Sequence, residues 1–325
     1  MTTHHALNIG IIGAARVAVY AMIAPAQENP RAHVAAIAAR DPVRARGFAT
    51  AHGVPHVHET YSALMVDPDI DLVYIATPPA FHAEHAIAAL RAGKHVLVEK
   101  PFAMNAAQAA EMVAAAGLAG RRVFEAFHYR HHALWQRIVD IVGGGQLGAL
   151  KAIDAAFYVP IENAPAEFRW HAELGGGALM DLGCYPLQWA RVVTGEEPVV
   201  SSARMRFVAG VDAETQAELR FPSGLPARIS CGMDGDSFKA FVTVEGTFGQ
   251  MSVMNPLAPQ MGHLLETRIE GVVRNETVDG PATFAAQLEA VVAALRDGAP
   301  FVLADDDPIK SMAAIDAIRA AALSA

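Results

Sequence analysis

The sequence predicts an α/β protein with a doubly wound parallel sheet, followed by a second α/β domain with a large, mostly antiparallel sheet. Over residues 1–127, short apolar runs alternate with alanine-rich helical stretches, which is typical of parallel βαβ units. From about residue 199 to 278, strand-like runs follow one another without helices, which indicates antiparallel pairing. The 325 residues suffice for two ordinary domains, which we place at 1–127 and 128–325.

The first domain is expected to contain five buried strands, because five short apolar runs are bounded by breaker residues. They lie at residues 7–12, 33–38, 71–77, 95–98 and 122–127. Helical stretches at 86–91 and 105–117 lie between the later strands, and Asn105 is a plausible helix cap.

The second domain begins with a helix at 135–142 and a strand at 151–159, and a glycine-rich stretch at 175–185 opens another helix. Turn signals then separate six strands, and two helices close the chain. The strands are expected at 202–208, 214–221, 227–231, 238–245, 250–253 and 265–273, and the helices at 284–296 and 308–323.

The composition narrows the possible partners. The chain is 53% hydrophobic and 18% charged, so it can bury a core, and its net charge of -9 argues against a nucleic-acid or anionic membrane partner. No uncharged run is long enough to cross a membrane, and the run from Leu7 lacks the basic start of a signal peptide. Cys184 and Cys231 are expected to be reduced thiols of a cytoplasmic protein.

The turn after the first strand stands where a dinucleotide fingerprint is expected. Gly13 supplies its first glycine and Ala18 its last small residue, but Ala15 replaces the middle glycine, so the motif is degenerate. A functional turn would direct the backbone N–H groups around Arg16 and Val17 at a diphosphate. The alternative is an ordinary turn between strand and helix.

The end of the second strand favours NADP over NAD. In NAD-binding folds an acid near this point binds the ribose 2′-hydroxyl, whereas an arginine accommodates a 2′-phosphate. Ala39 is not acidic, Arg40 is basic, and Arg44 lies one helical turn further on. Two alternatives remain: Arg40 is simply solvated, and Asp41 either takes the acid role in a shifted register or caps the next helix.

Other strand ends of the first domain are expected to line the same cleft. Thr77 and Pro78 follow the third strand, and His82 begins the next helix, so we group them with the cofactor-binding residues, although a satisfied helix-start histidine is the commoner case. Arg130 follows the fifth strand and joins this group. The histidines around it lack carboxylate or cysteine partners at ligand spacing, so we expect no metal site.

Residues 95–101 are the stretch around which the chain is organised. The apolar run 95–98 ends on Glu99, Lys100 and Pro101, and open α/β sheets place functional groups at the carboxyl ends of their strands. A lysine is costly to bury there unless it is paired or used. The alternative is a solvated strand-end lysine.

A second constellation lies in the later domain. Three glycines at 175–177 permit close backbone approach to a ligand or an unusual turn, and they open the helix with Asp181 and Tyr185. The spacing of four residues puts these two side chains on one helical face. The alternative is a capping acid and a core tyrosine.

The chain resembles the Gfo/Idh/MocA oxidoreductases in the Gly13 turn, residues 92–101, residues 175–185 and the hairpin at 245–249. The resemblance implies an N-terminal Rossmann domain, and a C-terminal domain whose open sheet often forms subunit contacts in a homodimer or homotetramer. It implies that Lys100 is catalytic and lies by the nicotinamide and the substrate hydroxyl. We group Glu99 with the cofactor-binding residues, and the alternative is that it only positions the lysine or the loop. Tyr185 stands where many members have histidine, as in the branch with dimeric dihydrodiol dehydrogenase and glucose–fructose oxidoreductase.

These residues together predict an NADP(H)-dependent oxidoreductase for a sugar, cyclic polyol or dihydrodiol. Hydride transfer at a carbinol carbon requires a proton to move at its oxygen, and Tyr185 can exchange that proton if a cation such as Lys100 favours its phenolate form. Asp181 would hold a substrate hydroxyl or orient Lys100, and Arg169 and Trp170 would shape the substrate pocket. The alternatives are glycoside cleavage with transient redox chemistry and a non-catalytic nucleotide sensor.

Overall fold

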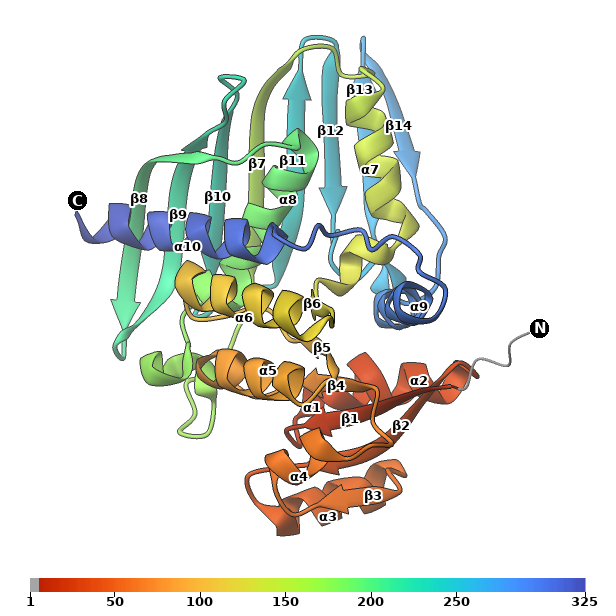
Figure 1. The fold of residues 1–325 in the computed structure, drawn as a ribbon. Helices are drawn as coiled ribbons and strands as arrows, with labels where there is room; N and C mark the ends of the chain where they lie inside the picture. Colours follow the sequence, from red (N-terminus) through yellow and green to blue (C-terminus); the bar gives the residue numbers. More distant parts are fainter. Residues whose placement is uncertain (1–5, 325) are drawn as a thin grey trace. The chain divides into compact units, whose positions relative to one another are not determined.

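A six-stranded parallel sheet forms the first unit of the computed structural model, which describes residues 6–324 (Figure 1). The strand order is β3-β2-β1-β4-β5-β6, so the direction of winding reverses between β1 and β4. In such sheets the ligand crevice lies at the carboxyl ends of the strands at this reversal. The strands are β1 (Leu7–Ile12), β2 (Ala32–Ala38), β3 (His56–His58), β4 (Leu72–Ile75), β5 (His95–Val98) and β6 (Val123–Glu125).

The parallel, doubly wound sheet confirms the predicted fold class, but the expected number of strands was wrong. The sequence indicated five strands, and β3 is the sixth. This edge strand has three residues, two of them histidines, and none is fully buried, so it lacks the apolar run by which strands are recognised.

Seven helices of the first unit connect or cover these strands. Gly10 of β1 illustrates how closely they pack, because a Cβ there would lie 2.7 Å from the Leu64 side chain of α4. The helices are α1 (Arg16–Ala18), α2 (Ala24–Glu28), α3 (Pro42–His52), α4 (Tyr61–Val66), α5 (His82–Arg91), α6 (Ala106–Ala119) and α9 (Thr283–Arg296). A π-helical turn, Val19–Ile23, joins α1 to α2.

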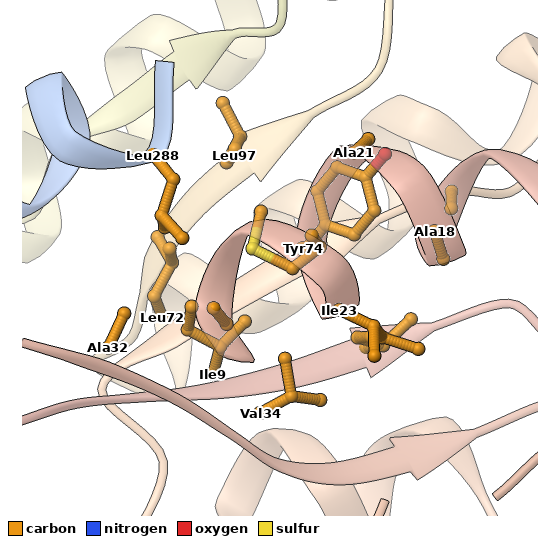
Figure 2. Packing of buried hydrophobic residues seen from close by; sticks show 14 of the residues in the cluster. Ile9, Ala18, Ala21, Ile23, Ala32, Val34, Leu72, Tyr74, Leu97 and Leu288 are labelled. Carbon is orange, nitrogen blue, oxygen red and sulfur yellow. The ribbon is translucent and has the colours of Figure 1, made fainter. Parts of the chain in front are cut away.

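Helix α9 belongs to the core of this unit although it lies far along the chain. Leu288, Val291 and Val292 are buried in one cluster with Ile9 and Leu72, and Figure 2 shows Leu288 beside Leu72. The first unit therefore consists of the chain up to His131 together with Thr283–Ile309, and the second of His132–Ala282 with the chain from Lys310. The expected division at residue 127 missed this return of the chain.

The second unit contains an eight-stranded sheet in the order β14-β13-β12-β11-β7-β10-β9-β8. All neighbouring strands are antiparallel except β7 and β10, which confirms the predicted, mostly antiparallel sheet. The strands are β7 (Leu150–Tyr158), β8 (Val199–Val208), β9 (Val211–Arg220), β10 (Pro226–Gly232), β11 (Lys239–Gly246), β12 (Gly249–Met254), β13 (Leu264–Ile269) and β14 (Val272–Glu276).

The second unit also contains three helices: α7 (Ala133–Gly143), α8 (Cys184–Thr194) and most of α10 (Asp307–Leu323). Phe157 of β7 packs edge-to-face on Tyr185 of α8, with the ring centroids 5.4 Å apart. The single strand expected at 265–273 is instead the hairpin β13–β14, which turns at Glu270 and Gly271 with φ of 50° and 83°. No helix within residues 6–324 is long and apolar enough to span a membrane.

Candidate active site

The turn after β1 requires glycine at its first position. Gly13 has φ of +103°, and a Cβ there would lie 2.9 Å from the carbonyl oxygen of Ala76, at the end of the neighbouring β4. The helical stretch then begins at Arg16, with Ala15 as a cap that offers no side-chain bond. Backbone N–H groups in the first turn of a helix have no acceptor within it, so those of Arg16 and Val17 suit an anionic ligand.

Two exposed arginines follow β2, and the second of them, on α3, supports the Gly13 turn. Arg40 is exposed, whereas Nη2 of Arg44 donates to the Ala14 carbonyl at 2.9 Å and ties α3 to the turn. Asp41 caps α3 by accepting from the Val43 backbone N–H at 2.9 Å. Of the two roles left open for Asp41, the structure therefore shows the cap.

The loop after β4 contains Thr77 and Pro78, both partly exposed, and then His82, which is fully buried. The imidazole Nε2 of His82 lies 2.7 Å from the Thr77 carbonyl oxygen, and Nδ1 lies 3.0 Å from that of Pro101. The side chain has no exposed surface, and both ring nitrogens lie against backbone carbonyls. His82 thus links the loops after β4 and β5, and its expected contact with the cofactor stays a prediction.

Strand β5 ends at Val98, and the next residues turn at the same edge of the sheet. The Glu99 backbone N–H donates to the Ile75 carbonyl at 3.1 Å, and the Tyr74 hydroxyl donates to Glu99 Oε1 at 2.5 Å. The Lys100–Pro101 peptide bond is cis. Since β1, β4 and β5 are parallel neighbours, Gly13, Thr77 and Lys100 all follow strands that end at one edge of the sheet.

The segment after β6 packs its histidines against the C-terminal return of the chain. His128 Nδ1 lies 2.7 Å from Thr283 Oγ1 and its ring stacks on Phe284, while the His131 ring packs on Phe301. Burial lowers the pKa of Arg130 between them, and the nearby Tyr129 and Asp307 oppose the shift. The described residues include no group of three or more His, Cys, Asp or Glu side chains that could hold a metal.

In the second unit, Asp181 and Tyr185 lie on one continuous helical stretch and both are largely buried. Asp181 belongs to a π-helical turn, Leu179–Gly183, that leads into α8, and such turns occur frequently at functional sites. Nε of Arg169 donates to Asp181 Oδ2 at 2.6 Å, and Nη1 donates to Glu167 at 2.9 Å. Burial alone would lower the pKa of the Arg169 guanidinium, but the two carboxylates raise it above its ordinary value.

The glycines at 176 and 177 are required by packing within the chain. A Cβ at Gly176 would lie 2.5 Å from the Arg169 carbonyl oxygen, and one at Gly177 would lie 2.1 Å from Asp212 Oδ1. Of the two explanations offered for the glycines, an unusual turn therefore accounts for these two positions. Trp170 is 5% exposed, as Tyr185 is, and its Nε1 donates to the Ile161 carbonyl, so the ring is held against the loop; its contact with substrate stays a prediction.

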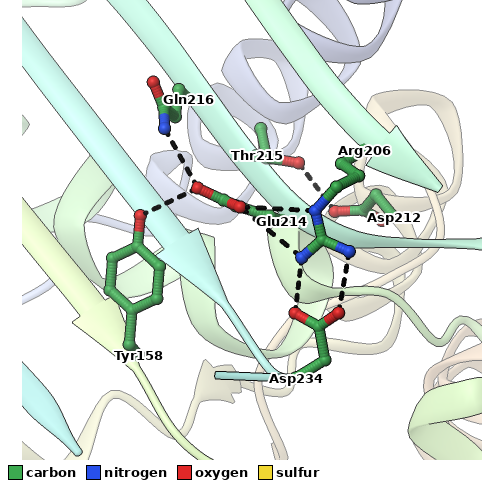
Figure 3. Close-up of polar contacts among 7 residues, drawn as sticks. All are labelled: Tyr158, Arg206, Asp212, Glu214, Thr215, Gln216 and Asp234. Carbon is green, nitrogen blue, oxygen red and sulfur yellow. Dashed lines mark hydrogen bonds and ion pairs between the residues drawn. The ribbon is translucent and has the colours of Figure 1, made fainter. Parts of the chain in front are cut away.

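Sequence reasoning missed three carboxylates, one beside the turn after Lys100 in the first unit and two beside the helix of Asp181 in the second. Glu125 accepts from the Phe102 backbone N–H at 3.0 Å, Glu167 pairs with Arg169, and Asp212 accepts from the Leu179 backbone N–H at 2.7 Å. Figure 3 shows Asp212 with Thr215, whose hydroxyl donates to it, beside a separate ion pair of Arg206 and Asp234. Only Glu125 had a signal, because it is an acidic residue inside the strand predicted at 122–127.

Comparison with known proteins shows that both parts of the chain match domains of one protein family. Residues 7–127 match the oxidoreductase family model with an NAD-binding Rossmann fold, and residues 135–252 match the GFO/IDH/MocA C-terminal domain. A D-xylose 1-dehydrogenase (NADP(+)) of Haloferax volcanii is 32% identical over 96% of each chain.

Two solved structures are similar over 98% of each chain, both with a TM-score of 0.90. They are an aldose-aldose oxidoreductase from Caulobacter crescentus complexed with glycerol, 28% identical, and a 3-ketoreductase from Actinomadura kijaniata in complex with NADP and TDP-benzene, 27% identical. The Gly13 turn, the Glu99–Lys100–Pro101 turn and the helix of Asp181 and Tyr185 are thus parts of a known architecture, and the chain belongs to the Gfo/Idh/MocA family of oxidoreductases.

Proposed function

We propose that the protein is an NADP(H)-dependent oxidoreductase that interconverts a secondary alcohol and a carbonyl on a sugar, cyclic polyol or dihydrodiol. The observation that carries the proposal is the position of Lys100, which follows β5 at the sheet edge where the Gly13 turn follows β1. The relatives support the substrate class, because they include a D-xylose dehydrogenase, an aldose-aldose oxidoreductase and a trans-1,2-dihydrobenzene-1,2-diol dehydrogenase of Sus scrofa.

The residues around the Gly13 turn fit a dinucleotide phosphate. The approach of Ala76 leaves no room for a side chain at Gly13, so backbone alone faces the diphosphate position, and Arg40 is exposed where a 2′-phosphate is expected. The NADP named with two of the relatives supports this preference over NAD. Bound nicotinamide would accept or supply the hydride.

The remaining chemistry falls to side chains of this chain. We assign the proton at the substrate oxygen to Tyr185, with Lys100 favouring its ionised form, and a substrate hydroxyl to Asp181. Arg169 supports the last role, because an adjacent guanidinium keeps a largely buried carboxylate ionised and able to accept.

The test is a screen of aldoses, inositols and aromatic dihydrodiols with NADP+ and NAD+ in parallel, followed by reduced-nicotinamide absorbance. Lys100→Met is expected to lower kcat by about 100-fold or more while NADP+ still binds. Near-normal turnover in that variant would overturn the role of Lys100. Product formation without net NADPH absorbance change would instead favour the transient-redox alternative.

We also propose that the chain forms a homodimer or homotetramer through the face of the eight-stranded sheet turned away from α8. Phe157 faces α8, so its neighbours Ala156 and Tyr158 face the other way. In register with Ala156 on that face lie Phe241, Met254 and Leu264, and Met254 is 60% exposed. Met254→Glu is expected to shift the assembly toward monomer in light scattering after size-exclusion chromatography, and an unchanged mass would contradict this surface.

A further inference from the structure

The turn around Lys100 is held by buried side chains from three other elements, which contact the Glu99 side chain before it and the backbone of residues 101 and 102 after it. Tyr74 of β4 donates to Glu99, His82 at the start of α5 contacts the Pro101 carbonyl, and Glu125 at the end of β6 accepts from the Phe102 N–H. Residues 99, 101 and 102 are thus each fixed by a different neighbour. These contacts restrict the position of the backbone from which the Lys100 side chain extends.

His82 links the loop after β4 to the loop after β5. Its ring is fully buried and lies between the Thr77 and Pro101 carbonyl oxygens, at 2.7 and 3.0 Å. Carbonyl oxygens only accept, so each contact is a hydrogen bond only when that ring nitrogen carries a proton. A neutral imidazole carries a single N–H, so His82 donates to one of these two carbonyl oxygens. A phenylalanine would keep nearly the volume of the ring and remove that donor.

Glu125 holds the other side of the turn. The residue is 2% exposed, and Oε1 accepts from the backbone N–H of Phe102, which is itself fully buried. Burying a carboxylate costs free energy, because its charge loses contact with water. Since Glu125 accepts from the backbone two residues after Lys100, we infer that it holds this turn and does more than fill space. Glutamine preserves an acceptor at this position and leucine does not.

We propose that His82 and Glu125 are positioning residues for Lys100, which they act through without touching substrate. The proposal rests on the catalytic role of Lys100 proposed above. Because a displacement of about 1 Å can cost roughly 100-fold in rate, loosening this turn should lower turnover far more than nucleotide binding.

The experiment compares His82→Phe, Glu125→Leu and Glu125→Gln with the wild type. The control is His95→Phe, at the opposite end of β5, where His95 Nδ1 also accepts one backbone N–H, from Arg122 at 3.0 Å. We expect kcat to fall about 10- to 100-fold in His82→Phe and Glu125→Leu, with NADP+ affinity by calorimetry within about threefold. Glu125→Gln should recover most of the loss, and His95→Phe should lower thermal stability without lowering kcat.

The coupling to Lys100 is tested by adding Lys100→Met to each variant. If His82 and Glu125 act through Lys100, the double variants should be no slower than Lys100→Met alone, whereas independent effects would multiply. Multiplying effects, or a normal kcat in stably folded His82→Phe and Glu125→Leu, would overturn the positioning role. A normal kcat in Lys100→Met itself would instead remove the proposed function on which it rests.

Discussion

The carboxylate of Asp212 occupies the space that a side chain at Gly177 would need. A Cβ at Gly177 would lie 2.1 Å from Asp212 Oδ1, while Oδ2 of the same carboxylate accepts from the Leu179 backbone N–H at 2.7 Å. Burial raises the pKa of Asp212, and the bonds from Leu179 and Thr215 oppose the shift. Asp212 belongs to β9 and lies 35 residues after Gly177 in the chain. Strand β9 therefore anchors the turn that carries Asp181.

Substituting Gly177 should destabilise the protein more than a substitution elsewhere in the same unit. Gly177→Ala combines a φ of +113° with the clash against Asp212, which together should cost about 2–4 kcal/mol. Thermal unfolding followed by circular dichroism measures the change. The control is Gly143→Ala at the end of α7, where a Cβ meets nothing within 4 Å, and its midpoint should hardly change. Equal midpoints for the two variants would contradict the packing described.

Removing the guanidinium beside Asp181 should affect both stability and turnover. Arg169→Gln removes the guanidinium that donates to the largely buried Asp181 carboxylate, which should cost about 1–3 kcal/mol and lower kcat. The matched control is Arg228→Gln, because Arg228 and Glu218 form an exposed pair 3.9 Å apart that should contribute little. Urea unfolding and steady-state kinetics of both variants provide the test, and a loss of equal size in the control would count against a special role for Arg169.

Arg40 should decide between the two nucleotides. Arg40→Gln removes an exposed guanidinium at the end of β2, and the loss of one charge-assisted contact should raise the Kd for NADP+ about 10- to 100-fold and leave that for NAD+ nearly unchanged. The control is Arg46→Gln, because Arg46 lies six residues further on, in α3, and pairs with Glu59 at the surface. Calorimetric titrations with both nucleotides measure the effect. A parallel change for NAD+ would show that Arg40 does not read the 2′-phosphate.

The buried histidines of the first unit predict instability in mild acid. Burial lowers the pKa of His82 to about 4 and of His128 and His131 to about 3, from an ordinary 6.5. The unfolded chain therefore takes up these protons first as the pH falls below about 6.5, and each histidine removes about 1.4 kcal/mol per pH unit until its folded pKa is reached. Urea unfolding at pH 7, 6 and 5 should show this loss.

His131→Phe should reduce that pH dependence at little cost. Among the described residues no hydrogen-bond partner meets Nε2 of His131, and the ring packs on Phe301, so phenylalanine keeps the aromatic contact. Stability at pH 7 should stay similar or rise, and the slope between pH 6 and 5 should fall by about 1.4 kcal/mol per unit. An unchanged slope would mean that His131 does not titrate as its burial predicts.

The sequence predicted the architecture wherever local pattern and tertiary structure agree. The alternation of apolar runs and helices indicated the parallel sheet, and the breakers around Lys100 located its turn. Edge strand β3 and the β13–β14 hairpin were missed, because His56–His58 has no apolar run and the turn at Glu270 resembles a continuing strand. The burial of His82 and Trp170 against backbone carbonyls was not predicted, since residue type does not reveal where a polar side chain will be buried. Asp212 gave no signal, because the turn at Gly177 and Leu179 that it supports lies more than 30 residues earlier in the chain.

The return of α9 to the first sheet has a consequence for biosynthesis. When residues 7–127 have left the ribosome, their sheet still lacks Leu288, Val291 and Val292, which complete its core. Almost all of the second unit must be synthesised before those side chains arrive. The N-terminal unit therefore cannot finish folding in chain order, and its uncovered apolar face must be protected from aggregation until the last segments of the chain emerge.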